Sequence, residues 1–262
     1  RFRQEMRAVG QVNHPNVVSA SDAGTIEGQH FLVMELVQGA DLARIIRDRG
    51  PLNVADACEI VRQAAIGLQH AHDNGLVHRD VKPSNIMLAL DGSVKLLDLG
   101  LAGLNNSEFE STANVVVTDR LTSVGQIMGT LDYMAPEQIT ASPEVDGKAD
   151  IYALGATLFQ LLTGRTPCGD RSEGTPERIE AVLQKPPLDI AALRDDVPEE
   201  LCSLVLTMLA KKPEDRPQAA VHVAGELERF TSDADLVALA EECRTSLDMP
   251  SADVDVTDDV SF

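Results

Sequence analysis

The chain has 262 residues, 44% of them hydrophobic, so it can bury a core as one large domain or two small ones. Its 42 acidic and 22 basic residues give a formal charge of -20, which repels phosphate groups and argues against nucleic acid or anionic lipid as a partner. The apolar runs are too short to span a bilayer, and the four scattered cysteines form no C-x-x-C motif, so we expect a reducing, cytoplasmic location without disulfides.

The first 37 residues predict a helix followed by a β-hairpin. Phe2, Met6, Val9 and Val12 are spaced as one apolar helix face, and the HPN sequence at 14–16 ends this pattern. Two β-like runs follow, VVSASDAG and QHFLVMELV, with a turn-prone segment between them. The sequence starts at Arg1 inside the helical pattern rather than with Met, which predicts that it is part of a longer protein.

A long amphipathic helix is predicted from Asn53 to Asn74, with Asn53 as its N-cap and Gly75 ending it. The polar loop in LVHRDVKPSNIML comes directly after this helix. Two short strands around Asp91-Gly92 follow the loop as a second hairpin. The polar residues of the loop are therefore expected between rigid elements.

The second half of the chain is expected to be mainly helical. Residues 103–128 lack periodicity and predict a long loop, whereas residues 151–162 are apolar nearly all round, as in a helix at the centre of a lobe. Further helices are predicted around 176–184, 198–210, 217–230, with Pro217 in the first turn of the last, and a weaker one at 235–247. The acidic residues 251–262 contain too few apolar side chains to fold alone.

The sequence HRDVKPSN contains the residue types that phosphoryl transfer requires. That reaction needs a group to orient the attacking hydroxyl and oxygen ligands for the metal ions that hold the phosphates. Asp80 could accept the hydroxyl proton, Asn85 could bind a metal ion, and Lys82 could neutralise charge on the transferred phosphate. An ordinary polar turn is the alternative for the loop taken alone. A metal site at His70 and His72 is disfavoured, because residues two apart point to different helix faces.

The loop resembles the catalytic loop of eukaryotic-type serine/threonine protein kinases, of the kind also found in bacteria. The sequence Asp98-Leu99-Gly100 is similar to the family's D-F-G motif, and MAPEQ at 134–138 is similar to its A-P-E motif. The resemblance further implies a buried ion pair between Glu137 and Arg216, and a central-helix aspartate, Asp150, that binds the backbone of the catalytic loop.

The resemblance implies an α+β, two-lobe kinase fold in which the large helical C-lobe is complete and the small β-rich N-lobe is only partly present. On this basis residues 1–36 belong to the N-lobe, 37–230 to the C-lobe and 231–262 to an acidic tail.

The resemblance also implies ATP and Mg²⁺ as cofactors. Asp98 and Asn85 would bind the metal. The other residues implied on the nucleotide side are Glu5, Met34, Glu35, Val37 and Met87. Plainer roles stay open for several of these: Glu5 as an exposed helix residue, Met34 and Met87 as core residues, and Asp41, a ribose or substrate candidate, as a helix cap.

Regulation by phosphorylation is a further implication. Arg79 would receive a phosphate from the activation segment, for which Thr122, Ser123 and Thr118 are the candidate acceptors, although a solvated loop would have the same composition. Thr130 matches the family threonine that hydrogen-bonds the catalytic Asp and Lys.

The sequence therefore predicts a serine/threonine protein kinase acting on Ser and Thr hydroxyls of protein substrates, with a homodimer as a candidate for autophosphorylation. The alternative is a pseudokinase or interaction module without turnover. No lysine precedes Lys82 and no G-x-G-x-x-G motif is present before it, so the phosphate-binding elements either lie before Arg1 or are absent.

Overall fold

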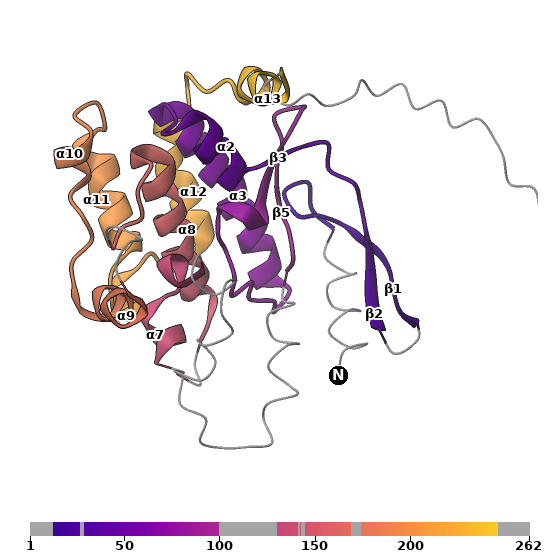
Figure 1. Cartoon of the computed structure of the whole chain (residues 1–262), viewed down its shortest axis with the longest axis horizontal. Helices are drawn as coiled ribbons and strands as arrows, with labels where there is room; N and C mark the ends of the chain where they lie inside the picture. Colours follow the sequence, from indigo (N-terminus) through magenta and orange to yellow (C-terminus); the bar gives the residue numbers. More distant parts are fainter. Residues whose placement is uncertain are drawn as a thin grey trace, which may run out of the picture.

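The computed structural model describes residues 13–26, 29–99, 130–140, 142, 145–168 and 174–245. It is an α+β structure in which a β-hairpin stands beside a large helical lobe, with a small sheet between the two (Figure 1). The helix predicted at the start of the chain, Glu5 included, lies outside the described residues. No helix in the described part of the chain is long and apolar enough to cross a bilayer.

The predicted first hairpin is confirmed. Strands β1 (Ala20–Ile26) and β2 (Gln29–Met34) pair antiparallel, with Ala20 opposite Met34. After Met34 the chain runs through residues 35–38, which we call the hinge segment, into the three-residue strand β3 (Gly39–Asp41). Asp41 caps the helix α2 (Leu42–Arg49), because its carboxylate accepts a hydrogen bond from the Arg44 backbone N–H at 2.9 Å. The capping role left open for Asp41 is therefore present.

The second hairpin is also confirmed, as strands β4 (Ile86–Ala89) and β5 (Val94–Leu96). Gly92, in the turn between them, has φ 80°, a backbone conformation that glycine adopts without strain. Strand β4 also pairs with β3, which gives the antiparallel order β3-β4-β5. Val17 makes an isolated parallel bridge to Leu96, so the segment before the first hairpin is joined to the edge of this sheet.

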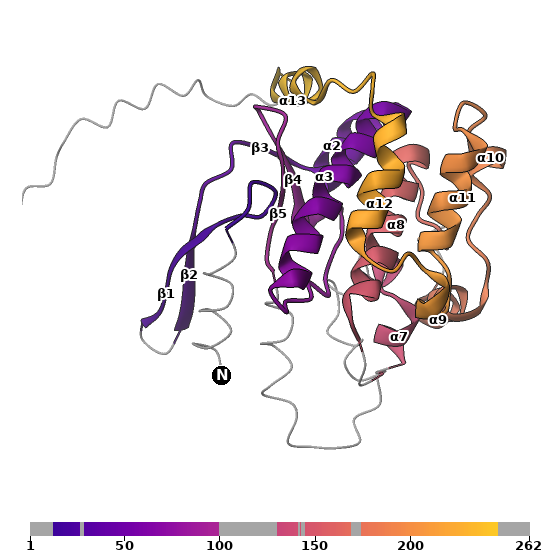
Figure 2. The same ribbon diagram turned by 180° about the vertical axis from the view of Figure 1, so that it is seen from behind.

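Two helices form the centre of the lobe. In α3 (Val54–Asp73), Asn53 caps the first turn by accepting a hydrogen bond from the Asp56 N–H at 2.8 Å, as predicted. Helix α8 (Gly147–Thr163) is buried along most of its length and lies between α3 and α11 (Glu199–Met208) in both views (Figures 1 and 2). A Cβ atom at Gly155 would lie 2.8 Å from Cβ of Met208 on α11, so glycine permits the close packing of these two helices.

The other helices surround this centre. They are α7 (Pro136–Ile139), α9 (Thr175–Gln184), α10 (Ile190–Leu193), α11 (Glu199–Met208) and α12 (Ala220–Leu227), with 3₁₀ turns at Pro83–Asn85, Leu131–Tyr133, Pro213–Asp215 and Glu228–Phe230. The prediction that Pro217 opens the helix of 217–230 is wrong. Arg216 is extended, as expected of a residue before proline, and the helix begins at Ala220, three residues after Pro217.

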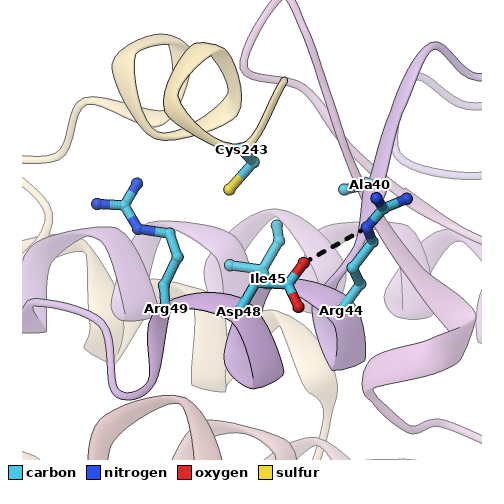
Figure 3. Close-up of a pocket in the computed structure, with 6 residues that line it drawn as sticks. All are labelled: Ala40, Arg44, Ile45, Asp48, Arg49 and Cys243. Carbon is cyan, nitrogen blue, oxygen red and sulfur yellow. Dashed lines mark ion pairs between the residues drawn. The ribbon is translucent and has the colours of Figure 1, made fainter. Parts of the chain in front are cut away.

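Helix α13 (Leu236–Thr245) packs against the lobe, across the end of the small sheet (Figure 2). Its buried side chains, Leu236, Leu239, Ala240 and Cys243, belong to the same hydrophobic core as α3 and α8. Figure 3 shows Cys243 pointing from α13 towards Ile45 and Arg49 of α2. Arg49 also pairs with Glu242, and burial raises the pKa of the Cys243 thiol. The predicted helix at 235–247 is thus present as part of the lobe.

Candidate active site

The catalytic loop, residues 78–85, begins after α3 and ends where β4 begins. Asp150 in α8 is completely buried and accepts hydrogen bonds from the backbone N–H groups of His78, at 2.9 Å, and Arg79, at 2.7 Å. The Nε2 atom of His72 lies 2.8 Å from the same carboxylate. Three polar groups therefore satisfy the buried charge, and the central helix fixes the start of the loop.

Asp80, Lys82, Asn85 and Thr130 form one hydrogen-bonded cluster. Lys82 Nζ lies 2.7 Å from Asp80 Oδ2 and 3.1 Å from Thr130 Oγ1. Asn85 Nδ2 donates to Asp80 Oδ2 at 3.0 Å and to the Asp80 carbonyl at 2.8 Å. The structure thus brings together the four residues that the resemblance assigned to chemistry. With 29% of its side chain exposed, the Asp80 carboxylate remains accessible to a substrate hydroxyl.

Asn85 and Asp98 lie on neighbouring backbone segments. The Leu97 N–H donates to the Asn85 carbonyl at 2.9 Å, and this bond continues the pairing of β4 with β5. The side-chain NH₂ group of Asn85 donates both of its hydrogen bonds to Asp80, so the side-chain oxygen of Asn85 points away from Asp80. This oxygen has one long contact, of 3.4 Å, from the Ser84 hydroxyl. Asp98 is exposed and has φ 56°. An amide oxygen and a carboxylate are hard oxygen ligands that fit Mg²⁺.

The residues expected on the adenine side are more exposed. Met34 is 41% exposed, so in the described structure it is not a buried core residue, which was the alternative role for it. Val37 and Met87 are half-buried, and Met87 pairs across the sheet with Asp41 and Lys95. Glu35 accepts a hydrogen bond from Lys95 Nζ at 2.8 Å, and this bond holds the pKa of the Glu35 carboxyl below its usual value. Their proposed roles towards a nucleotide stay predictions.

The expected pair of Glu137 and Arg216 is present. Arg216 donates to both carboxylate oxygens of Glu137, at 2.6 and 2.8 Å, and the guanidinium side chain is fully buried. Arg216 also donates to the backbone carbonyls of Lys148, Ala210 and Lys211. This arrangement fixes the end of the activation segment, Asp98–Glu137, against the core of the lobe.

The regulatory residues are only partly covered. Thr118, Thr122 and Ser123 lie outside the described residues. Arg79 is exposed, and within the described ranges no acidic side chain pairs with its guanidinium. Its role as a phosphate receptor stays a prediction.

Sequence reasoning disfavoured a metal site at His72 but missed its hydrogen bond to Asp150. The ring also lies against α8, because a Cβ at Gly147 would lie 2.6 Å from it. Spacing within α3 could not reveal this contact, since the two partners are 78 residues apart. His70 instead stacks on His14, with ring centroids 4.9 Å apart.

Comparison with known proteins agrees with this geometry. The family model of the protein kinase domain matches residues 1–226. The chain is 37% identical over 246 residues to serine/threonine-protein kinase PknH of Mycobacterium bovis, covering 94% of this chain and 39% of that protein. It is also 37% identical over 245 residues to PknL of Mycobacterium tuberculosis, covering 92% and 55%, and 34% identical over 237 residues to PknB of Mycobacterium leprae, covering 88% and 36%. The chain thus spans between 36% and 55% of the length of these relatives.

Proposed function

Because this chain belongs to the protein kinase family, we propose that the protein transfers the γ-phosphoryl group of ATP to Ser and Thr hydroxyls of protein substrates. The observation that carries the proposal is the cluster of Asp80, Lys82, Asn85 and Thr130. An aspartate held between an ammonium and an amide, with part of its surface exposed, is suited to orient a hydroxyl group.

The residues would divide the work as follows. Asp80 orients the substrate hydroxyl and takes its proton as the new O–P bond forms and the bond from phosphorus to ADP breaks. Lys82 lies between Asp80 and Thr130 and places positive charge beside the transferred group. Asn85 and Asp98 would hold Mg²⁺, which neutralises phosphate charge when bound.

The adenine side of the site would be formed by Met34, Met87 and the backbone of Glu35 and Val37. Two observations support this placement. The hinge segment lies between β2 and β3, and β3 pairs directly with β4, which carries Met87. We also propose the division into an N-lobe at 1–36, a C-lobe at 37–230 and a tail from 231, whose helix α13 packs onto the core of the C-lobe.

We propose a cytoplasmic location for this domain, supported by four free cysteines. Burial raises the pKa of one of them, Cys58, to about 12, which keeps this thiol protonated. Activation through a phosphate bound by Arg79, and autophosphorylation within a homodimer, are parts of the same proposal.

The test is a phosphorylation assay on the gene product as encoded, with γ-labelled ATP and Mg²⁺. We expect acid-stable label on serine or threonine, in the protein itself or in a basic model substrate, and none with Asp80→Asn. Equal labelling of the wild type and this variant would reject the assigned mechanism. No labelling by either would favour the pseudokinase alternative.

A further inference from the structure

Arg79, directly before Asp80, is held in an unfavourable backbone conformation from both sides. Its φ is 65°, a region that residues with a side chain rarely adopt. Its N–H donates to Asp150 at 2.7 Å, and its carbonyl accepts a hydrogen bond at 2.8 Å from Nε2 of Gln138. A conformation that is intrinsically disfavoured persists only where its surroundings hold it.

Gln138 follows the A-P-E motif, in α7, and its amide makes two different contacts. The oxygen accepts a hydrogen bond from the Ala135 N–H at 2.9 Å, which closes the first turn of α7. The nitrogen donates to the Arg79 carbonyl, 59 residues away. One contact is local to the activation segment, and the other joins that segment to the catalytic loop.

We propose that Gln138 is a positioning residue for phosphoryl transfer, an inference that rests on the proposed function. The Arg79 carbonyl belongs to the same planar peptide as the Asp80 N–H, so rotation of this peptide moves the backbone of Asp80. Asp150 holds the peptide before Arg79, whereas Gln138 holds the peptide after it. The end of the activation segment thereby sets the orientation of the catalytic aspartate.

Three substitutions separate the two contacts of this amide. Gln138→Glu keeps an acceptor for the Ala135 N–H but places a carboxylate oxygen against the Arg79 carbonyl. Gln138→Lys keeps a donor for that carbonyl but removes the local acceptor, and Gln138→Met removes both. We expect kcat to fall about tenfold in the Glu and Met variants, the factor that corresponds to one hydrogen bond. The Lys variant should retain more activity than either, and KM should change less than about twofold because Gln138 is not assigned to either substrate.

Gln218→Glu is the matched control. It carries the same charge change, and the Oε1 atom of Gln218 contacts Lys148 Nζ rather than the catalytic loop. It should keep wild-type kcat. If Gln138 only stabilised α7, the order would reverse, with the Glu variant like the wild type and the Lys variant impaired. That order, or wild-type kcat in the Glu variant, would overturn the proposal.

Hydrogen exchange supplies a readout that does not need activity. The amides of His78 and Arg79 donate to Asp150, so loosening the loop should raise exchange in a peptide covering residues 76–82. We expect faster exchange in Gln138→Glu and Gln138→Met, but not in Gln218→Glu. A wild-type protein without kinase activity would refute the proposed function alone, whereas unchanged exchange in these variants would refute the role of Gln138.

Discussion

The catalytic loop and the hinge segment would face the same nucleotide, but they are held in different ways. In the loop, Asp80 contacts both Lys82 and Asn85, and the loop's first residues bind a fully buried aspartate of the central helix. In the hinge segment, Leu36 is 89% exposed, and Glu35 contacts the lobe through a partly exposed ion pair with Lys95. The large lobe thus holds the proposed phosphate-transfer side of the site through buried contacts, while the proposed adenine side is held by more exposed contacts.

Among substitutions outside the cluster of Asp80, Lys82, Asn85 and Thr130, the largest effect should come from Asp150→Asn, which breaks the support of the catalytic loop. One of the two backbone donors from His78 and Arg79 would then face an amide NH₂ instead of an oxygen. We expect kcat to fall about 100-fold, since displacements near 1 Å have effects of this size. Steady-state kinetics would measure it. Asp146→Asn is the control, because Asp146 caps the same helix and Asn is an equivalent cap, so its activity should be unchanged.

Next in size is the loss of the buried ion pair by Glu137→Gln. The fully buried Arg216 guanidinium would lose its compensating charge, so we expect the free energy of unfolding to fall by about 3 kcal/mol. Urea unfolding would measure the change. Glu226→Gln removes the exposed pair with Arg229 and should change stability by less than about 0.5 kcal/mol. Equal effects of the two substitutions would contradict the importance given to burial.

Helix α13 should contribute stability without touching the chemistry. Leu239 is 5% exposed, so Leu239→Ala should lower the free energy of unfolding by about 2 kcal/mol while kcat stays unchanged. Val237→Ala on the same helix, 46% exposed, should have an effect below about 1 kcal/mol. Thermal unfolding with parallel kinetics separates the two properties. A large drop in kcat at full folding would mean that α13 acts on the catalytic loop.

The smallest effect is expected in the hinge, from Lys95→Met. Loss of a partly exposed pair should change stability by less than about 1 kcal/mol and raise KM for ATP about two- to threefold. The pKa of the Glu35 carboxyl in the folded protein is below its ordinary value of 4.5. The pair with Lys95 therefore contributes fully to the free energy of unfolding at pH values above 4.5, and this contribution is lost as the pH falls through the pKa of Glu35 in the folded protein. Urea unfolding should therefore show a difference between the proteins near neutral pH that disappears in acid. A difference that grows in acid would contradict this account.

The order of the main elements could be predicted, because each has a local signal. The apolar face and the Asn53 cap identified α3, and Asp91-Gly92 identified the second hairpin. Strand β3 was missed, and helix α2 was indicated only by the alternative of Asp41 as a cap. Helix α2 has eight residues, with only Leu42, Ile45 and Ile46 buried, and β3 has three residues, fixed by pairing with β4. Short elements of this kind depend on tertiary contacts that local periodicity does not contain.

The candidate site shows the same division. Asp80, Lys82 and Asn85 stand in one motif, so sequence was enough to group them. His72 contacts Asp150, which is 78 positions away in the sequence, and Gln138 contacts Arg79, which is 59 positions away. No local sequence pattern indicates either contact. Of the residues that hold the loop, Asp150 was indicated through the family resemblance, whereas the contacts of His72 and Gln138 could not be predicted from the sequence.

The most direct measurement compares the wild type with Asp80→Asn in two assays on the gene product as encoded: turnover with a protein substrate, and binding of ADP with Mg²⁺. Asp80 is assigned to the substrate hydroxyl rather than to the nucleotide. We predict that turnover falls at least about 1,000-fold while nucleotide affinity stays within about threefold. Retained turnover, or a parallel loss of turnover and nucleotide binding, would contradict the assignment of Asp80 as the group that orients the hydroxyl.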